Sequence, residues 1–237
     1  MWPELCLEAL DRPEWKSAPG EGRIRIWKRE PNNKVGGKVV DAASAPVHPL
    51  TRDEEEQVVC VDRYDRRRGA ASKLEAHRRG LLHRAFSILV FNERRELLLQ
   101  RRADTKYHFA GRWSNTCCGH PRPGEGTDAA AARRLREELG FAAPLEEHQQ
   151  LIYRARDPVS GLIEHEYLHV FQGIFAGEPV PSPEEVGAWR WASWRWASIP
   201  DVREDLAGSP DSFTPWFALL MDRFLEAAGT DGIRRVG

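Results

Sequence analysis

The sequence lacks the features of a membrane protein and of a secreted domain held together by disulfides. Its longest apolar run, around residues 88–91, is far too short to cross a bilayer. The start of the chain has neither a basic leader nor a long apolar segment, so we expect no secretory signal and a cytoplasmic protein. Only four cysteines occur among 237 residues, and their spacing shows no pairing rhythm. We therefore expect reduced thiols and no membrane partner.

An excess of charge of one sign is also absent. Lys and Arg together number 35 and Asp and Glu 36, which gives a formal net charge of -1. Nucleic-acid binding usually needs a strong basic excess on one face, so we expect no nucleic-acid partner. Hydrophobic residues make up 41% of the chain and charged residues 30%, as in folded globular proteins. Any basic residues with a functional role should therefore act locally, on a small anion.

The chain divides into an irregular start and a longer patterned part. Residues 1–50 contain many turn-forming residues and no sustained period, which predicts a weakly ordered N-terminal extension. A single domain is predicted over residues 51–230, followed by a short tail at 231–237. This organisation leaves enough chain in one domain for a sizeable core.

Periodicity and turn residues predict the elements of this domain. We expect strands at residues 57–61, 85–91, 96–100, 167–175 and 186–191, the second and third forming a hairpin. We expect one helix at 127–139, started by Thr127 or Asp128 as a cap and ended by Gly140. A second helix is expected from Pro215 to about Ala227. Strands interleaved with a few helices predict an α/β (α+β) fold.

The first cluster of residues that could carry chemistry is Cys117-Cys118-Gly119-His120, which precedes the loop 121–126. A thiol two residues from an imidazole on a tight turn suits a metal site, an acid/base pair or simply a buried turn. No second Cys or His pair with short spacing follows, which disfavours a structural zinc site. From the residues alone, these interpretations remain open.

The second cluster is a pair of carboxylates, Glu164 and Glu166, at the start of a predicted strand. Strand alternation places both side chains on one face, although a solvated strand edge is the simpler interpretation. The histidines His77, His83 and His120 are individually weak signals, because a lone histidine is often structural. Together these five residues supply three imidazoles and two carboxylates, which is a plausible ligand set for a divalent metal.

The third feature is the helix that follows the Cys/His cluster. Gly119, five residues, Glu125, seven residues and then Arg133 to Phe141 resemble the signature of the Nudix superfamily. Where the hydrolases of that superfamily carry a glutamate after the arginine, this chain has Arg134. Their acidic row binds magnesium to cleave a diphosphate, so a guanidinium at this position favours binding the diphosphate over cleaving it.

Four blocks of the sequence resemble, in the same order, those of the type I isopentenyl diphosphate isomerases. The blocks are Gly80 to Ser87, Asn115 to Pro121, Glu164 to Glu166 and Phe213 to Trp216, and the similarity runs from Val58 to Phe224. The resemblance implies a Nudix-like α/β/α sandwich with a mixed central sheet. It also implies conversion of isopentenyl diphosphate to dimethylallyl diphosphate, by protonation and deprotonation through a tertiary carbocation, in isoprenoid biosynthesis.

The resemblance assigns site residues position by position. It implies that one divalent ion, Mn²⁺, Zn²⁺ or Mg²⁺, is held by His77, His83, His120, Glu164 and Glu166. It implies that Mg²⁺ bridges the diphosphate to the carboxylate of Glu138 and the carbonyl of Cys118. It makes Cys118 and Glu166, the latter assisted by Tyr153, the catalytic acid/base groups. It implies that the substrate is bound by Lys73, Arg102, Lys106, Arg134 and Trp216.

The chemistry gives each residue type a reason. Protonating an alkene makes a carbocation that water would trap, so the pocket should be dry and aromatic. Protons are added and removed at different carbons, so two acid/base groups should face opposite sides of the substrate. The charged end needs Mg²⁺ and several cationic side chains. We therefore expect a small-molecule diphosphate as partner, bound by a monomer or a homodimer.

Two competing functions differ in class from the isomerase. A Nudix hydrolase of a nucleoside diphosphate derivative fits the helix signature, but the arginine at position 134 and the Cys118/His120 pair speak against it. A binding module that has lost its activity is the other, and it is disfavoured because every acid, base and ligand position is filled.

Overall fold

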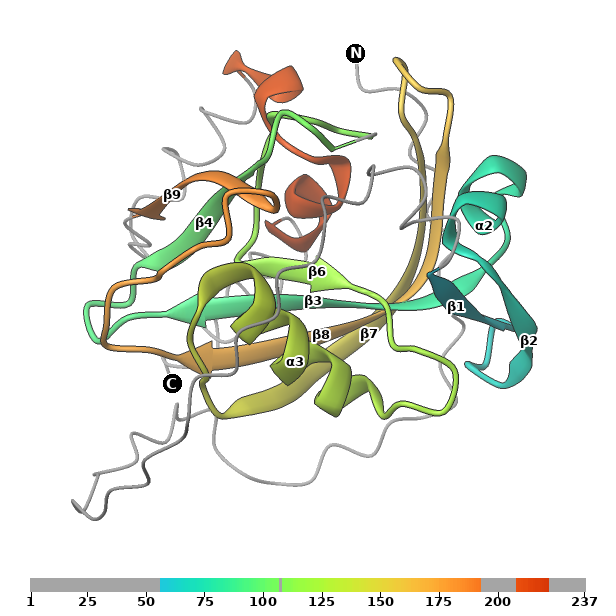
Figure 1. The fold of residues 1–237 in the computed structure, drawn as a ribbon, viewed down its shortest axis with the longest axis horizontal. Coiled ribbons are helices and arrows are strands. Elements are labelled where there is room, and N and C mark those ends of the chain that lie inside the picture. The colour runs from blue at the N-terminus through green and yellow to red at the C-terminus, as the bar shows by residue number, and fades with distance from the viewer. Residues whose placement is uncertain (1–55, 107, 193–207, 222–237) are drawn as a thin grey trace, which may run out of the picture. The chain divides into compact units, whose positions relative to one another are not determined.

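A computed structural model of the chain describes residues 56–106, 108–192 and 208–221, all within one compact unit (Figure 1). The predicted extension at 1–50 and the predicted tail at 231–237 lie outside the described residues. The strands are β1 (Gln57–Val61), β2 (Arg67–Ser72), β3 (His83–Phe91), β4 (Leu97–Arg102), β5 (Trp113–Ser114), β6 (Cys117–Gly119), β7 (Leu145–Arg156), β8 (Ile163–Ile174) and β9 (Val186–Ala192). The helices are α2 (Lys73–Arg79), α3 (Thr127–Leu139), the 3-10 helix η1 (Pro210–Ser212) and residues 215–221.

The described strands form one mixed sheet, with β3 near its centre. Strand β8 runs parallel to β3 in an unbroken register from His83 opposite Glu166 to Phe91 opposite Ile174. The other pairs are antiparallel: β7 lies along β8, β6 along β3, and β9 along β4. The mixed sheet expected from the sequence is therefore confirmed.

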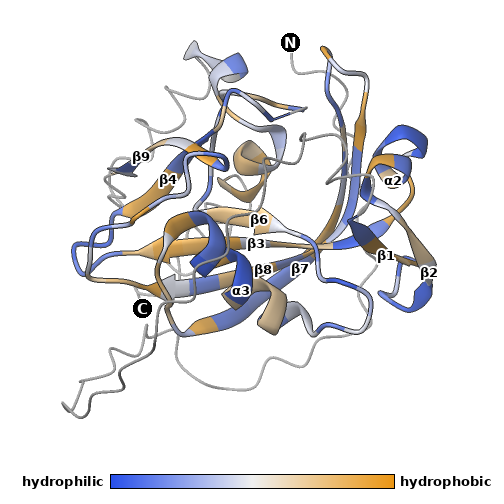
Figure 2. Ribbon diagram, viewed as in Figure 1, coloured by the Kyte–Doolittle hydropathy of each residue, from blue (hydrophilic) through white to orange (hydrophobic). Residues whose placement is uncertain are grey.

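Helices cover both faces of this sheet. Along β3 the side chains of Phe86, Ile88 and Val90 pack with α3, whereas Ala85 and Leu89 pack with residues 215–221. Successive residues of a strand point to opposite faces, so this alternation creates two cores. Figure 2 shows the apolar residues along β3 and β6 and more polar residues on α2. The result is the α/β/α sandwich that the sequence predicts.

The ends of α3 agree only partly with the sequence prediction. The helix spans the expected residues and ends at Gly140, which has the left-handed conformation (φ 73°) and donates its backbone N–H to Arg136. The predicted cap at Thr127 or Asp128 is wrong, because Gly126 occupies the cap position and no side chain caps the helix. Asp128 instead lies in the first turn, where a carboxylate interacts favourably with the helix dipole.

Several strands are longer than predicted, and the extra residues matter for function. Strand β8 begins at Ile163, so Glu164 and Glu166 belong to the strand and do not precede it. Strand β3 begins at His83, two residues earlier than expected. The connection between β1 and β2 is short, because Arg67 already belongs to β2.

Replacing Gly140 with alanine is expected to lower the free energy of unfolding by more than about 2 kcal/mol. A Cβ at this position meets the carbonyl oxygen of Val180 at 2.5 Å, and the left-handed backbone alone costs about 1–2 kcal/mol for a residue with a side chain. Gly124 is the matched control, since its φ is +89° and nothing lies within 4 Å of an added Cβ. Urea unfolding midpoints measure both variants, and equal losses would contradict the packing argument.

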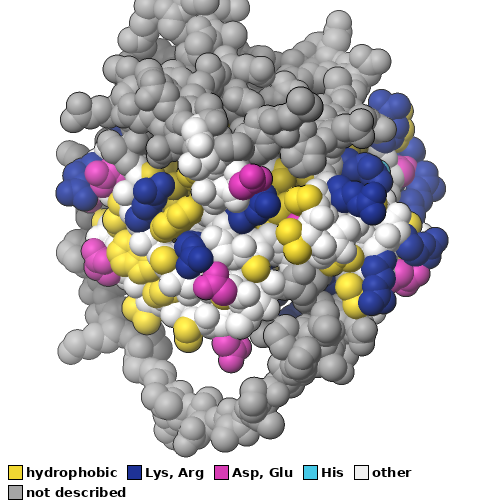
Figure 3. All heavy atoms as spheres, turned by 90° about the horizontal axis from the view of Figure 1, so that it is seen from above, with side chains coloured by type: hydrophobic (Ala, Val, Ile, Leu, Met, Phe, Trp, Pro, Cys, Tyr) yellow, Lys and Arg dark blue, Asp and Glu magenta, His cyan; other side chains and the backbone are white. Residues whose placement is uncertain are grey.

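The outer surface is mixed in character. On the described part of the face shown in Figure 3, Lys and Arg side chains are scattered among acidic and apolar ones. Within the described residues, no helix has the length and apolar character needed to cross a membrane.

Candidate active site

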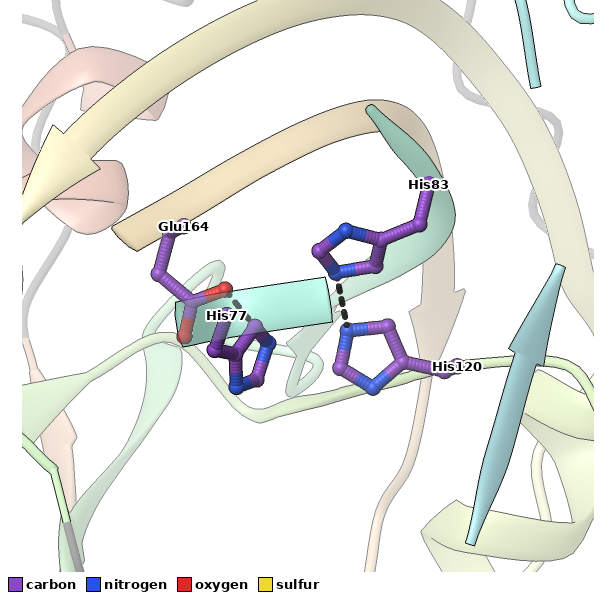
Figure 4. Close-up of side chains that lie close together, drawn as sticks. All are labelled: His77, His83, His120 and Glu164. Carbon is purple, nitrogen blue, oxygen red and sulfur yellow. Dashed lines mark hydrogen bonds and ion pairs between the residues drawn. The ribbon is translucent and has the colours of Figure 1, made fainter. Parts of the chain in front are cut away.

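Four elements bring a group of histidines and a carboxylate together (Figure 4). His77 comes from α2, His83 begins β3, His120 follows β6 and Glu164 lies on β8. One ligand atom from each of these residues lies within 4.8 Å of the others, and all four residues are buried. Residues that are up to 87 positions apart in the sequence thus share one small volume.

Local structure explains why these side chains converge. Helix α2 starts where Ser72 accepts the backbone N–H of Glu75 and ends at Gly80, a left-handed cap that turns the chain into β3. The β3–β8 register then places His83 directly opposite Glu166. Paired residues of neighbouring strands point to the same face, so the histidine and the glutamate meet there.

The distances within this group are those of direct contacts. The Nε2 atoms of His83 and His120 are 3.2 Å apart, and His120 Nε2 lies 3.1 Å from Glu166 Oε1. His77 Nε2 lies 3.2 Å from Glu164 Oε2. The side chains of the two glutamates are only 5% and 9% exposed, so the alternative of a solvated strand edge is wrong.

The electrostatics of the group favour neutral rings at His83 and His120 and an ionised carboxylate at Glu164. Burial lowers the pKa of His83 to about 4 and that of His120 well below its usual value. Burial alone would raise the pKa of Glu164, but the adjacent His77 and His108 hold it well below the usual range. Burial and repulsion by Glu164 raise the pKa of Glu166 well above it.

These features fit a divalent metal ion. Neutral imidazoles present the free ring nitrogen that a metal needs, and nitrogen and carboxylate oxygen donors suit Mn²⁺, Zn²⁺ and Mg²⁺. The Nδ1 atom of His83 lies 2.8 Å from the carbonyl of Leu81, which fixes the ring so that Nε2 points into the group. Four of the five predicted metal-ligand residues therefore converge, and Glu166 lies beside them in contact with His120.

The predicted glutamate and tyrosine form a direct pair. Tyr153 on β7 lies opposite Glu166 in the β7–β8 register, and its hydroxyl donates to Glu166 Oε2 at 2.7 Å. The tyrosine is 1% exposed. Burial and the nearby carboxylates raise the pKa of its hydroxyl well above the usual value, so the proton stays on the phenol.

The second predicted acid/base group, Cys118, lies on β6 opposite Ser87 of β3. Its sulfur is 3.3 Å from the hydroxyl oxygen of Ser87 and 3.3 Å from the side-chain oxygen of Asn115. Removal from water raises the pKa of the Cys118 thiol to about 12, against the opposing effect of these two hydrogen bonds. The thiol therefore carries its proton at neutral pH.

Cys118 and Glu166 project from the same face of the sheet. Cys118 pairs with Ser87 and Glu166 with His83, and residues four apart on β3 share a face. The cysteine also packs against the apolar cluster that contains Tyr153 and Trp216. Two groups that are 48 positions apart in the sequence thus border one apolar region.

Trp216 is held in place on this side of the sheet. Its indole N–H donates to the hydroxyl of Ser114 at 2.9 Å. Phe109 meets it edge to face at 5.2 Å, and the guanidinium carbon of Arg102 lies 5.6 Å from its ring centre. The predicted aromatic residue and one predicted diphosphate-binding cation are therefore neighbours.

The other predicted cations are engaged in ion pairs. Lys106 and Arg134 both contact the carboxylate of Glu185, Arg134 at 3.2 Å. Arg134 also pairs with Glu138 at 2.5 Å, and Gln100 donates to the same glutamate. These carboxylates raise the pKa of Arg134, although burial opposes them.

Lys73 pairs with a different carboxylate. Its ammonium contacts Glu56 at 2.9 Å. Its charge also acts on the metal-ligand group, because it contributes to the lowered pKa of His120.

Sequence reasoning missed several residues of the site. His108 lies 2.6 Å from Glu164, and Glu185 links two predicted cations. Neither has a signal in the sequence, because one is a lone histidine in a turn and the other follows a Ser-Pro turn. Ser87 and Asn115 lie within blocks of the family resemblance, which gave the only hint of their role beside Cys118.

Comparison with known proteins agrees with this geometry. The NUDIX domain family matches residues 81–217. The isopentenyl-diphosphate Delta-isomerase of Halorhodospira halophila is 51% identical over 168 residues, which cover 70% of this chain and 93% of that protein. The enzyme of the same name from Burkholderia multivorans is 49% identical over 169 residues, covering 71% and 93%.

Similarity among solved structures concerns the fold alone. The crystal structure of DR0079 from Deinococcus radiodurans superposes with a TM-score of 0.56 at 17% identity, covering 71% of this chain and 98% of that one. The sequence relatives, in contrast, exceed 45% identity over most of their own length. The chain therefore belongs to the isopentenyl-diphosphate Delta-isomerase family of Nudix proteins.

Proposed function

We propose that this protein converts isopentenyl diphosphate to dimethylallyl diphosphate in isoprenoid biosynthesis. The observation that carries the proposal is the placement of Cys118 and the Glu166–Tyr153 pair on one face of the sheet, around the apolar cluster that contains Trp216. One group that gives a proton and one that takes a proton, beside an apolar region, suit an alkene isomerisation.

The reaction moves one double bond and leaves the diphosphate intact. A proton adds to the terminal methylene carbon, the π electrons form the new C–H bond, and a tertiary cation results at the neighbouring carbon. A proton then leaves the carbon on the diphosphate side, and the electrons of that C–H bond form the new double bond. One acid/base group loses a proton to the substrate and the other gains a different proton from it, so the enzyme needs a proton exchange to return to its starting state.

The chain's own residues meet these demands. Cys118 and Glu166 are the two groups that give a proton to the substrate and take one from it. Tyr153 donates a hydrogen bond to Glu166. Trp216 belongs to a cluster of buried apolar side chains that excludes water, and an aromatic ring stabilises a cation. The buried surroundings of Cys118 keep its thiol protonated until the substrate arrives.

Two metal ions belong to this proposal. His77, His83, His120, Glu164 and Glu166 would hold one divalent ion, and Glu138 with the carbonyl of Cys118 would hold Mg²⁺ on the diphosphate. When bound, such ions neutralise negative charge and set the protonation of nearby carboxylates. The nitrogen and oxygen donors of the histidine group suit Mn²⁺, Zn²⁺ or Mg²⁺.

The diphosphate is proposed to bind the cationic residues Lys73, Arg102, Lys106 and Arg134. In the structure, Lys106 and Arg134 pair with Glu185, and Arg102 donates to the carbonyl of His108. These internal partners hold the cations in place before the substrate binds. An arriving diphosphate gains ordered donors and does not have to fix flexible ones.

A product assay separates this function from the hydrolase alternative. Purified protein supplied with isopentenyl diphosphate and Mg²⁺ is expected to yield dimethylallyl diphosphate with no release of phosphate. A panel of nucleoside diphosphate derivatives is expected to stay intact, because Arg134 replaces a glutamate of the hydrolase signature. Release of phosphate or nucleoside monophosphate, without any isomer, would support the hydrolase instead.

Cellular location and assembly complete the proposal. We propose a cytoplasmic enzyme that acts as a monomer or a homodimer on a small diphosphate. Size-exclusion chromatography with light scattering measures the assembly directly.

A further inference from the structure

His108 is a buried histidine outside the ligand set implied by the family resemblance. It lies between β4 and β5 and is 7% exposed. Its Nε2 atom is 2.6 Å from Glu164 Oε1, and its ring centre is 5.2 Å from that of His77. It therefore touches the edge of the metal-ligand group without belonging to the four residues whose ligand atoms converge.

The contact with Glu164 has the length of a hydrogen bond. Two ligands at right angles around one ion, each about 2.1 Å from it, are about 3.0 Å apart. A separation of 2.6 Å is shorter, so His108 and Glu164 Oε1 are better described as donor and acceptor than as two ligands of one ion. The imidazole then carries its proton on Nε2, and the carboxylate oxygen accepts it.

The two carboxylates of the group are held in the same manner. Glu166 receives the hydroxyl of Tyr153 on Oε2, while its Oε1 atom lies 3.1 Å from His120. Glu164 meets His108 on Oε1, while its Oε2 atom lies 3.2 Å from His77. Each carboxylate thus has one oxygen held by an outer donor and the other beside a ligand histidine.

The backbone next to His108 is unusual and supports a functional placement. Phe109 has a positive φ of 47°, a conformation that residues with side chains rarely adopt. This turn directs His108 toward Glu164 and Phe109 toward Trp216, and the His108 carbonyl accepts from Arg102 at 3.3 Å. Strained backbone of this kind persists where the surroundings fix it, often at active sites.

We propose that His108 is a positioning residue that orients Glu164 for the divalent ion by donating an N–H to its outer oxygen. The inference rests on the metal site of the proposed function. Outer hydrogen-bond partners of metal ligands fix the direction of the ligand, and their loss typically weakens metal binding about 10–100-fold. The backbone at His108 also connects the metal group to the substrate region, because its carbonyl accepts from Arg102 and the next residue, Phe109, contacts Trp216.

Metal affinity tests the proposal without using activity. The whole protein, freed of metal with a chelator, is titrated with Mn²⁺ and the free ion is followed by electron paramagnetic resonance. His108→Phe, which keeps a ring but has no donor, is expected to bind Mn²⁺ about 10–100-fold more weakly than the wild type. His108→Gln retains an N–H donor and is expected to recover most of the affinity.

A matched control separates this role from general packing. His169 is also buried and contacts two carboxylates, Asp65 and Glu147, away from the metal group. His169→Phe should leave the Mn²⁺ affinity unchanged. If His108→Phe does not fold, His108→Ala replaces it, with the same expected loss.

The outcomes also separate this inference from the function on which it rests. Wild-type protein that binds no Mn²⁺, Zn²⁺ or Mg²⁺ would overturn the metal site itself. Wild-type protein that binds the ion, with an equal affinity in the His108 variant, would overturn only the role of His108. If His108→Phe and His108→Gln lose the same amount of Mn²⁺ affinity, orientation of Glu164 by a hydrogen bond is likewise contradicted.

Discussion

Cys118→Ala is expected to reduce kcat/KM for isopentenyl diphosphate by about 10²–10⁴-fold, the usual contribution of a general acid or base. The substitution removes the only thiol on this face of β6, held 3.3 Å from Ser87 and 3.3 Å from Asn115. No neighbouring hydroxyl replaces it, since a serine oxygen is a far weaker acid than a thiol. Steady-state assays at saturating Mg²⁺ measure the loss.

The adjacent cysteine provides the control for this variant. Cys117 is also on β6, but its side chain lies in the opposite core with Leu135 and Phe86. Cys117→Ala removes a buried sulfur from the same strand and is expected to keep the turnover within a few-fold of the wild type. Near-normal turnover in Cys118→Ala, or an equal loss in both variants, would show that the role assigned to Cys118 is wrong.

Glu166→Gln is expected to lower kcat/KM by at least about 10²–10⁴-fold, because the carboxylate serves both as a proton carrier and as a metal ligand. The amide has the same shape and still accepts the Tyr153 hydroxyl, so packing changes little. The amide cannot carry the exchanged proton and is a poorer ligand for a divalent ion. Turnover and bound metal, measured on the same sample, record both effects.

Tyr153→Phe separates the two roles of Glu166. It removes the 2.7 Å hydrogen bond and leaves both carboxylate oxygens in place. We expect reduced turnover with metal content unchanged, whereas Glu166→Gln should lose both. Full turnover in Glu166→Gln would exclude this glutamate from the proton transfer.

Much of the fold was predictable because strong local patterns dominate it. The apolar run of β3 and the alanine-rich α3 carry clear strand and helix signals, and the structure confirms both. Strand β7 was missed, because residues 145–150 are mostly polar and, among the described strands, pair with β8 alone. Helix α2 was missed because seven residues give too short a period to detect.

The site was predictable through family resemblance and only weakly through spacing. His77, His83 and His120 are individually unremarkable, and only the register of β3 with β6 and β8 brings two of them to Glu166. His108 shows the limit of the sequence, because its partner Glu164 is 56 positions away. Contacts of that kind depend on tertiary structure and leave no periodic trace.

The most direct test of the central claim is the fate of hydrogen when the wild-type protein acts on isopentenyl diphosphate in deuterated buffer. The account predicts dimethylallyl diphosphate with deuterium in a methyl group, observed by NMR, and an unbroken diphosphate observed by phosphorus NMR. Deuterium should be missing from the products of Cys118→Ala and Glu166→Gln within the same time. Two results would contradict the proposed isomerisation. One is isopentenyl diphosphate that stays unchanged and unlabelled after long incubation with metal-loaded wild-type protein, and the other is release of phosphate.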